Sequence, residues 1–402
     1  MNPIPAGIEA YITKRVSFAF RGRTFNFALS QGLFSSADID AGSRLLLKVF
    51  SQMLDTRPPP KRILDAGCGM GVLGICAAAG ADCTVRCQDR DELARQITEY
   101  NARQNGIPQE KLSAHTEPLL AGDGPWDLIL SNLPAKAGKP VLEDFIRRSS
   151  GLLNPEGRAV IVVVNPLADF FRSRIEKIIQ DETGPGHTVL VYGPSEGPRE
   201  PVRPGPGFLT QNPAYHRHSG RYEMKKIGYT LDTVYGAADF DAPGGPAQAG
   251  AKLADKLGPR LPPASTGLMY EPGQGHFPVW FAAGRSLREY TLAGRNILAL
   301  EASRHNLRQK VEIRSTVDFH ALVGEKSWDF IAAFPEAIPQ TDRLGAHWED
   351  LAALLADRGV VLLGFPSAEG ERFDRKKPKF FTRLGDVKRK GFRALAYQKT
   401  RF

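Results

Sequence analysis

Three glycines at alternate positions, Gly67, Gly69 and Gly71, are the residues whose spacing most clearly indicates a ligand site. Glycine has no Cβ, so the backbone can turn tightly and a ligand can lie directly against it. Asp65 precedes the glycines, and the apolar residues on either side predict a buried strand followed by a helix. In the Gly-x-Gly-x-x-Gly pattern of dinucleotide-binding loops the last glycine would fall at Val72. We therefore expect a cofactor cradle, but the loop alone does not say which cofactor it holds.

Two further polar residues follow predicted strands. Asp89 follows the strand predicted for residues 84–88, and Asn132 follows the strand predicted for residues 126–131. Ligands of open α/β sheets bind at the carboxyl ends of the strands, so both side chains are expected at the edge that carries the glycine loop. A carboxylate at the position of Asp89 can accept hydrogen bonds from both hydroxyls of a ribose.

The elements that must position these residues alternate between strands and helices. The periodicity predicts helices over residues 72–79, 91–104, 141–153 and 168–179, and strands over residues 84–88, 112–115, 126–131, 157–164 and 187–192. This alternation indicates a doubly wound α/β sheet. Residues 193–207 are rich in Pro and Gly and predict a surface loop, residues 221–227 predict a last strand closing the sheet, and residues 242–264 predict an inter-domain linker.

Size and composition predict a globular protein with more than one domain, because the chain has 402 residues and is 42% hydrophobic. It shows neither a signal-like start nor an apolar run long enough to cross a bilayer, so we expect a cytoplasmic protein without membrane contact. The spacing of Cys68, Cys76, Cys83 and Cys87 fits no paired zinc-ligand pattern. We expect these cysteines to be core residues in a reducing compartment, and no metal site.

Nearly all of the net charge of +9 lies in one segment. Residues 372–393 contain ten Lys or Arg and two Asp, and so carry +8, with four phenylalanines interleaved. Such a segment is either a solvated charged hairpin or a surface that follows phosphates, and the concentration of charge favours nucleic acid. The predicted substrate-binding residues are Lys376, Lys377, Lys379, Lys388, Arg389 and Lys390.

The second half of the chain repeats the first. Residues 65–73 align with 271–279, residues 126–134 with 328–336, and residues 152–159 with 354–361. The shared Trp-Asp and Leu-Leu anchors favour a duplication over chance similarity. The expected organisation is a domain over residues 1–240, a linker over residues 241–264 and a second domain over residues 265–402.

In this alignment the second copy loses the residues that could contact a ligand. Phe277 takes the place of the third glycine, Arg295 that of Asp89, and Phe334 that of Asn132. A phenyl ring at Phe277 would fill the space that a cofactor needs. We therefore expect the ligand to bind to the first copy only, and the second copy to serve architecture or binding.

The first copy resembles the class I S-adenosylmethionine-dependent methyltransferases of the "methyltransferase small" type, and among them the bacterial ribosomal RNA guanine-N2 methyltransferases. The resemblance covers residues 34 to 164 and rests on residues 34–47 (from Phe34-Ser35 through Asp40), the glycine loop, Asp89 and residues 131–134. It implies two tandem Rossmann-like, seven-stranded domains, the second degenerate, and S-adenosylmethionine as the cofactor. In those RNA enzymes the degenerate copy comes first, whereas here it comes second, so the domain roles transfer by analogy.

The resemblance also implies roles for individual residues. Asp65 and the backbone at Gly67 and Gly69 would face the methionine part of the cofactor, and Asp89 would bind the ribose hydroxyls. Arg90 would lie beside the adenine, and the residues that end the third strand would flank it, although His115 is equally consistent with a solvated strand-end histidine. The implied cofactor-binding residues are Asp65, Ala66, Gly67, Cys68, Gly69, Gly71, Asp89, Arg90, His115, Thr116 and Glu117.

The family's catalytic motif is Asn/Asp-Pro-Pro-aromatic after the fourth strand. The lone pair of an exocyclic amine is delocalised into the ring, and the Asn oxygen and a following carbonyl accept its two hydrogens and orient the nitrogen. This chain has Asn132-Leu133-Pro134-Ala135, so the resemblance implies Asn132 and Pro134 as catalytic residues but no aromatic follows them. Tyr215 or an aromatic near Phe34 could supply the stacking ring. Residues 212–215 resemble the motif but read as a turn.

The expected function is an S-adenosylmethionine-dependent N-methyltransferase acting on an exocyclic amine of a base in RNA, with ribosomal RNA favoured. The first domain would be catalytic, and the second would bind the RNA. The missing aromatic leaves open a methyltransferase acting on a protein or a small metabolite, because a non-planar substrate needs no stacking. The altered motif also leaves open a non-enzymatic cofactor-binding or scaffold protein, which ranks last because the loop, Asp89 and Asn132 occur together. The sequence does not predict the oligomeric state.

Overall fold

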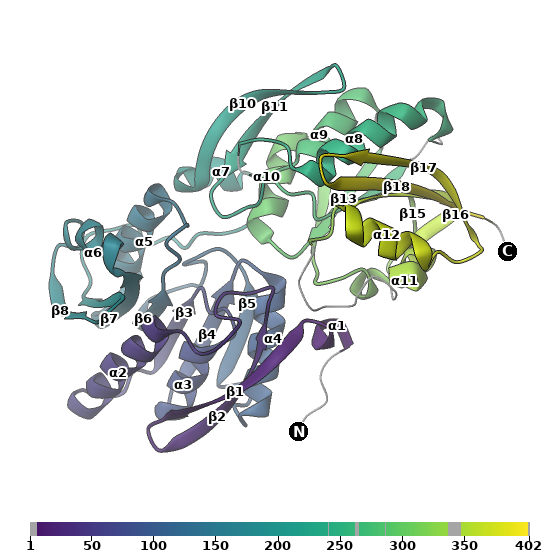
Figure 1. Cartoon of the computed structure of the whole chain (residues 1–402). Coiled ribbons are helices and arrows are strands. Elements are labelled where there is room, and N and C mark those ends of the chain that lie inside the picture. Colours follow the sequence, from purple (N-terminus) through teal and green to yellow (C-terminus); the bar gives the residue numbers. More distant parts are fainter. Residues whose placement is uncertain (1–5, 240, 262–264, 286, 337–346, 401–402) are drawn as a thin grey trace. The chain divides into compact units, whose positions relative to one another are not determined.

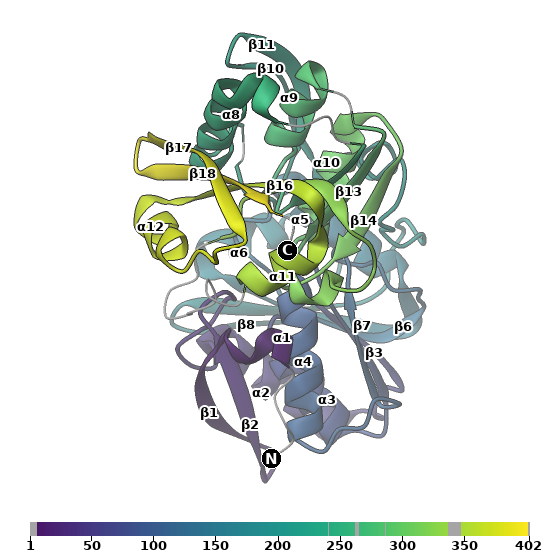
Figure 2. The ribbon, with the colours of Figure 1, turned by 90° about the vertical axis from the view of Figure 1, so that its right-hand side faces the viewer.

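The computed structural model describes residues 6–239, 241–261, 265–285, 287–336 and 347–400, and divides into two compact units, Met1–Pro204 and Gly205–Phe402 (Figures 1 and 2). Each unit contains a seven-stranded sheet and a separate two-stranded hairpin. The prediction of two tandem doubly wound α/β domains is therefore confirmed.

The first unit has the strand order β5-β4-β3-β6-β7-β9-β8, in which β9 runs antiparallel to both of its neighbours and β3 to β7 are parallel. Its strands are β1 (Ile12–Phe20), β2 (Arg23–Ser30), β3 (Arg62–Ala66), β4 (Thr84–Asp89), β5 (Leu112–Thr116), β6 (Trp126–Asn132), β7 (Leu153–Val164), β8 (Ile178–Thr183) and β9 (His187–Tyr192). Its helices are α1 (Ala6–Glu9), α2 (Ala41–Thr56), α3 (Val72–Gly80), α4 (Glu92–Gln104), α5 (Lys139–Gly151) and α6 (Asn165–Arg172). The carboxyl ends of the parallel strands thus meet at one edge of the sheet.

The second unit repeats this order as β14-β13-β12-β15-β16-β18-β17. Its strands are β10 (His216–Met224), β11 (Ile227–Val234), β12 (Thr266–Tyr270), β13 (Glu289–Gly294), β14 (Val311–Ser315), β15 (Trp328–Ala333), β16 (Leu355–Pro366), β17 (Phe381–Arg389) and β18 (Phe392–Lys399). Its helices are α7 (Phe208–Gln211), α8 (Gly245–Leu257), α9 (His276–Gly284), α10 (Ile297–Leu307), α11 (His347–Leu354) and α12 (Ser367–Arg375), with 3₁₀ turns at Pro213–Tyr215, Gly258–Arg260 and His320–Leu322.

The same side-chain anchors recur in both units. Asp127 on β6 accepts hydrogen bonds from two backbone N–H groups at the start of β3, both at 2.9 Å, and Asp329 on β15 does the same at the start of β12, at 2.8 and 3.0 Å. Asn101 on α4 joins the backbone of β2 to that of the glycine loop, and Asn306 on α10 makes the equivalent bonds. The matched Trp-Asp segments of the sequence are therefore structural anchors of one fold used twice.

Three predictions for the connecting segments are wrong. The helix expected over residues 168–179 ends at Arg172, and β8 follows it with alternating partly buried and exposed residues. Residues 221–227 lie in the hairpin of β10 and β11, which belongs to the second unit, so the boundary falls at residue 204 rather than 240. The expected linker contains α8, because its alanines favour helix and pack against β16 and β18. Residues 262–264 of that linker lie outside the described residues.

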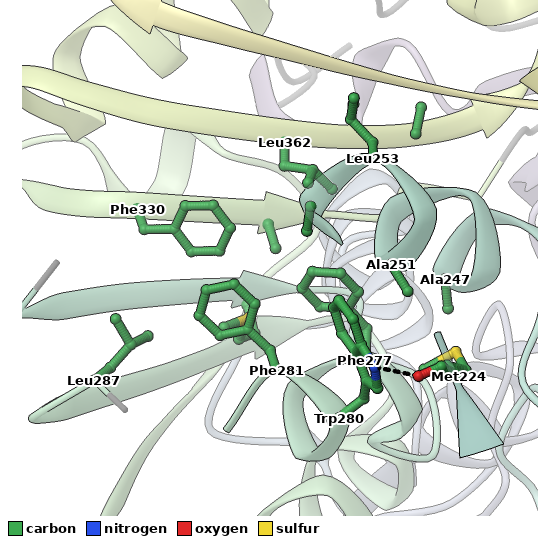
Figure 3. Packing of buried hydrophobic residues seen from close by; sticks show 14 of the residues in the cluster. Met224, Ala247, Ala251, Leu253, Phe277, Trp280, Phe281, Leu287, Phe330 and Leu362 are labelled. Atoms are coloured by element: carbon green, nitrogen blue, oxygen red, sulfur yellow. Dashed lines mark hydrogen bonds between the residues drawn. The ribbon is translucent and has the colours of Figure 1, made fainter. Parts of the chain in front are cut away.

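The core of the second unit lies on both faces of its sheet. Alternate strand residues point to opposite sides, so Phe330 and Leu362 join the cluster under α8 and α9, whereas Ile331 joins the cluster under α11 and α12. Figure 3 shows the first cluster, where Phe277 and its neighbours pack between α9, α8 and the sheet. The hydrophobic strands and helices that the sequence pattern predicts are thus buried on two faces, as a doubly wound sheet requires.

Candidate active site

The glycine loop of the first unit is turned back against the end of β4. The backbone N–H groups of Gly67 and Cys68 donate to the carbonyl of Gln88 at 2.8 and 3.0 Å. Gly67, Gly69 and Gly71 have φ values of 77°, 56° and 82°, a region that side chains other than glycine rarely adopt. A Cβ built on Gly69 meets nothing within 4 Å. The loop therefore presents bare backbone to open space, as a cofactor cradle must.

Two carboxylates flank this loop, and they play different parts. Asp65 is fully buried on β3 and accepts a hydrogen bond from the N–H of Gly74 at 2.8 Å, which ties the strand to the first turns of α3. Its second oxygen has no hydrogen-bond partner among the described residues. Burial raises the pKa of Asp65 to about 7, and Asp89 adds to the effect. Asp65 therefore supports the backbone at the start of α3, and its contact with the methionine part of a cofactor stays a prediction.

Asp89 ends β4 and stands beside the loop. Its Oδ2 accepts from the N–H of Gly69 at 3.0 Å and its Oδ1 from the N–H of Asp91 at 3.0 Å. Burial raises the pKa of Asp89, the Asp91 carboxylate raises it further, and Arg90 opposes both. Each carboxylate oxygen has lone pairs beyond the one it uses, so Asp89 keeps the capacity to accept two ligand hydroxyls.

The predicted residues at the end of β5 are held by neighbouring charged side chains. Arg86 lies 3.0 Å from Nε2 of His115 and donates to Glu117 at 2.7 Å, and the hydroxyl of Thr116 donates to Glu92. Burial lowers the pKa of His115, and Arg86 lowers it further. A contact of His115, Thr116 or Glu117 with a cofactor stays a prediction.

Asn132 ends β6 at the same edge of the sheet. Its Nδ2 donates to Oδ2 of Asp40 at 2.7 Å and to Oγ of Ser43 at 3.0 Å. Its Oδ1 makes no hydrogen bond within the part of the chain that the structure describes. The carbonyl of Pro134 accepts from the N–H of Ala137 at 3.0 Å, which closes a turn after the strand. The structure therefore places an amide oxygen, available as an acceptor, at the edge that carries the glycine loop.

Sequence reasoning missed the part played by Asp40 and Ser43. Asp40 is the N-cap of α2, and its Oδ2 also accepts from the backbone N–H of Ser43 at 3.1 Å. An Asp shortly before an apolar run predicts a helix start. That pattern gave no sign that the cap would also bind a residue of β6.

In the second unit the glycine loop has changed at a different position from the one expected. The helix after the loop begins directly after Gly71 in the first unit and directly after Gly275 in the second, so Gly273 matches Gly69 and Glu271 matches Gly67. The prediction that Phe277 replaces the third glycine is wrong. The sequence alignment matched two acidic residues, whereas the positive φ values of the retained glycines, 58° and 97°, fix the true register.

The carboxylate beside the loop has changed sides in the second unit. Gly294 ends β13 as Asp89 ends β4, so the expected match of Arg295 with Asp89 is also wrong, and Arg295 matches Arg90. Glu271 accepts from the N–H of Arg295 at 2.9 Å, and a Cβ built on Gly294 would lie 3.0 Å from the Glu271 carboxylate. The side chain of Glu271 thus fills the space next to the strand end from the loop side, where the first unit has Gly67.

The prediction that Phe334 takes the position of Asn132 is confirmed, because β6 and β15 begin at matched tryptophans. The ring of Phe334 packs on Phe277 with 4.9 Å between centroids. Cβ atoms built on Gly250 and Gly364 would lie 2.8 Å from the Phe334 ring, so both glycines make room for it. The edge that is polar in the first unit is therefore filled with hydrocarbon in the second.

The basic segment forms α12 and the hairpin of β17 and β18 at the edge of the second sheet (Figure 1). Phe373 and Phe381 are core residues and not surface rings. Lys377 donates to backbone carbonyls, Arg389 donates to Gln248 at 2.5 Å, and Lys388 pairs with Glu371 at 2.8 Å. Lys376, Lys379 and Lys390 are exposed, and so is Lys388, which keeps its ion pair.

The two candidate stacking rings differ in accessibility. Phe34 precedes α2 and is 70% exposed, whereas Tyr215 is 3% exposed and packs on Phe208. The cysteines are buried and unpaired, and in the described residues no cluster of His, Cys, Asp and Glu could hold a metal ion. None of the described helices is long and apolar enough to span a membrane.

A seven-stranded sheet with its antiparallel strand next to the edge, and a glycine loop after its first strand along the chain, β3, defines the class I methyltransferase fold. The methyltransferase small domain family matches residues 24–182. The chain is 33% identical over 150 residues to the uncharacterized protein YbxB of Bacillus subtilis, covering 37% of this chain and 72% of that protein. The chain belongs to this family of S-adenosylmethionine-dependent methyltransferases.

Two named relatives differ in the substrate that their names give, ribosomal RNA in one and a ribosomal protein in the other. One is the ribosomal RNA small subunit methyltransferase C of Chromohalobacter salexigens, 33% identical over 138 residues, or 33% of this chain and 39% of that protein. Another is the ribosomal protein L11 methyltransferase of Syntrophotalea carbinolica, 33% identical over 142 residues, or 33% of this chain and 46% of that protein. The match thus spans less than half the length of both enzymes.

One solved structure matches both units. A 16S rRNA N2 G1207 methyltransferase of T. thermophilus, in complex with AdoMet and guanosine, aligns with a TM-score of 0.64 and 18% identity. The alignment covers 96% of this chain and 98% of that one. At this identity the match shows the fold.

The residues of the first unit fit the cofactor of this family. The space beside Gly69 is open, and a partly buried carboxylate with spare lone pairs, Asp89, stands next to it. In the second unit, a Cβ built on the equivalent glycine, Gly273, would lie 3.0 Å from the carboxylate of Asp239, and the carboxylate of Glu271 lies beside Gly294. The family match confirms the predicted cofactor, S-adenosylmethionine. Its contacts with the individual residues of the first unit stay predictions.

Proposed function

We propose that this chain methylates an exocyclic amine of a base in RNA, with ribosomal RNA the favoured substrate. The observation that carries the proposal is Asn132, whose amide oxygen is an available acceptor at the edge of the sheet that holds the cofactor cradle. A relative of known class, the small subunit enzyme of Chromohalobacter salexigens, is named for action on ribosomal RNA. In this proposal the first unit is catalytic and the second binds the RNA.

Bound S-adenosylmethionine supplies an electrophilic methyl group on its sulfonium. The chain's own residues need only bind and orient the amine that attacks it. The Oδ1 of Asn132 accepts one amine hydrogen and a nearby backbone carbonyl the other, which turns the nitrogen lone pair toward the methyl group and favours the tetrahedral nitrogen that forms. The proton leaves after transfer, so no strong base is required. Phe34, the exposed ring on the segment leading to α2, is our candidate for stacking on the base.

The second unit supplies charge rather than chemistry in this proposal. Lys376, Lys379 and Lys390 are exposed directly after α12, on the segment that follows it and on the turn of the β17–β18 hairpin. The equivalent part of the first unit, residues 165–193, is not rich in basic residues. Phosphate contacts give affinity without sequence information, as expected of a domain that holds RNA while another selects the base.

The RNA-binding part is tested by reversing the three exposed charges together, as Lys376→Glu, Lys379→Glu and Lys390→Glu. Binding of deproteinised ribosomal RNA should weaken, and the slope of log affinity against log salt should fall by about 2 if all three contact phosphates. The matched control reverses Lys226, Lys252 and Lys310, three exposed lysines elsewhere in the same unit, and should keep the wild-type slope. Equal slopes for both triple variants would exclude the basic hairpin as the RNA-binding surface.

A protein substrate is the second candidate, because Ala135 leaves the motif without its aromatic and one relative is named for ribosomal protein L11. The two candidates are separated by labelling ribosomes of the source cell with radioactive S-adenosylmethionine. Label that is released by ribonuclease and resists protease supports RNA. Label that is released by protease and resists ribonuclease supports the protein substrate and contradicts our proposal.

A further inference from the structure

We propose that Asp40 and Ser43 are positioning residues that fix which atom of Asn132 faces the substrate. This inference rests on the proposed function, since it concerns the same reaction. An amide side chain has one acceptor and one donor end, and only the acceptor end can bind an amine hydrogen. Something must therefore hold the side chain in one of its two orientations.

The hydrogen bonds of the site select that orientation on chemical grounds. Nδ2 of Asn132 lies 2.7 Å from Oδ2 of Asp40 and 3.0 Å from Oγ of Ser43. An ionised carboxylate only accepts hydrogen bonds, so the amide nitrogen and not the oxygen must face Asp40. Both hydrogens of the amide are then used, and Oδ1 is directed away from the two residues. A rotation of the amide by 180° would place two acceptors against each other.

The start of α2 is shaped to bring the carboxylate to this point. Oδ2 of Asp40 also accepts the backbone N–H of Ser43 at 3.1 Å, so the bond that caps the helix fixes the oxygen that binds Asn132. A Cβ built on Gly42 would lie 2.8 Å from that same oxygen and 2.9 Å from the ring of His187. Glycine at position 42 therefore leaves the room in which the carboxylate lies.

The second unit shows that the fold does not need this polar cluster. Counting from the two N-caps, Gly244 of α8 takes the place of Asp40, and Ala247 that of Ser43. Phe334 takes the place of Asn132, and its ring is packed against Phe277. The same helix and strand are joined there without any of the three polar groups. The cluster in the first unit is therefore kept for a task other than holding α2 on the sheet.

The test compares two substitutions that cap the helix equally well but differ in reach. Asp, Asn and Ser are similar N-cap residues, so Asp40→Asn and Asp40→Ser should both keep α2 intact. In Asp40→Asn the introduced amide oxygen can still accept from Asn132, whereas the shorter hydroxyl introduced by Asp40→Ser cannot reach it. We expect kcat with deproteinised ribosomal RNA to fall by no more than about threefold in Asp40→Asn and by about 30-fold or more in Asp40→Ser, because misorienting a reacting group can cost about 100-fold.

Three further measurements complete the design on the full chain. The Kd for S-adenosylmethionine, measured by calorimetry, should change by less than about twofold in both variants. The loss of activity is then a loss in kcat and not in cofactor binding. Ser43→Ala removes one of the two acceptors and should lower kcat less than Asp40→Ser. The side-chain amide protons of Asn132, assigned in NMR spectra by comparison with Asn132→Ala, should be protected from exchange in wild type and Asp40→Asn but not in Asp40→Ser.

The outcomes separate this inference from the proposed function. A wild-type chain that methylates protein and not RNA contradicts the proposed function, and the NMR comparison then still decides the positioning role. Equal kcat for Asp40→Asn and Asp40→Ser, or equal protection of the Asn132 amide in both, would show that Asp40 acts only as a helix cap and would overturn the inference.

Discussion

The two units of this chain show which parts of the fold are independent of the ligand site. Both keep the aspartate that holds the start of β3 or β12, Asp127 and Asp329, and the asparagine that joins helix, hairpin and loop. Thr98 and Ser303 also make the same bond to a loop carbonyl, at 3.1 and 3.0 Å. These contacts satisfy backbone groups, and their loss would leave buried polar atoms unpaired.

The units differ wherever a side chain would face a ligand. The first unit has an open loop with Asp89 beside it, and the second has Glu271 in the loop with Gly294 at the strand end. The polar contact of Asn132 becomes the apolar packing of Phe334. The comparison teaches that the class I sheet stays intact after its site has been filled, because filling it with hydrocarbon adds buried surface and removes buried polar groups.

The largest effect is expected at the matched strand-end pair. Asn132→Ala should lower kcat by about 100- to 1,000-fold, the range for removing one group that stabilises a transition state, with little change in the Kd for S-adenosylmethionine. Phe334→Leu at the equivalent position of the second unit is the control and should leave kcat unchanged. The measurement is single-turnover methyl transfer at saturating cofactor. Similar losses in both variants would contradict the assignment of catalysis to the first unit.

A smaller effect is expected at the carboxylate beside each glycine loop. Asp89→Asn replaces charge-assisted hydrogen bonds to the ribose by neutral ones, which should weaken S-adenosylmethionine binding by about 10- to 30-fold. Glu271→Gln makes the same chemical change in the second unit and should leave the Kd as it is. Both constants come from calorimetry on the full chain. A Kd that responds to Glu271→Gln would mean that the second unit takes part in cofactor binding.

The smallest effect is expected in the aromatic core of the second unit. Phe277 is fully buried and its ring packs on Trp280, Phe281 and Phe334 (Figure 3). Phe277→Leu should destabilise the second unit by about 1–2 kcal/mol, as expected for a modest loss of volume and of ring contacts. Scanning calorimetry should show the shift, with an unchanged Kd for S-adenosylmethionine. Weaker binding of S-adenosylmethionine would instead indicate that Phe277 lines a ligand site.

The sequence predicted six of the seven strands of the first sheet, their alternation with helices and the duplication, because those features depend on apolar periodicity and on repeated Trp-Asp anchors. It placed Asn132 and Asp89 at the ends of their strands for the same reason. It missed β8, whose residues alternate between partly buried and exposed. It misplaced Glu271 and Phe277 by two residues, since two acidic residues aligned well in sequence although the loop register is set by left-handed glycines. The part of Asp40 could not be predicted, because a cap residue and a strand residue 92 positions apart meet only in the folded chain.

The asymmetry between the units is tested most directly by titrating the full chain with S-adenosylmethionine in a calorimeter. We expect one binding site per chain. At a free cofactor concentration about 100 times the Kd, the unfolding transition of the first unit should gain about 2.7 kcal/mol and that of the second unit none. Two sites per chain, or a stabilised second unit, would contradict the claim that only the first copy of the glycine loop accepts the cofactor.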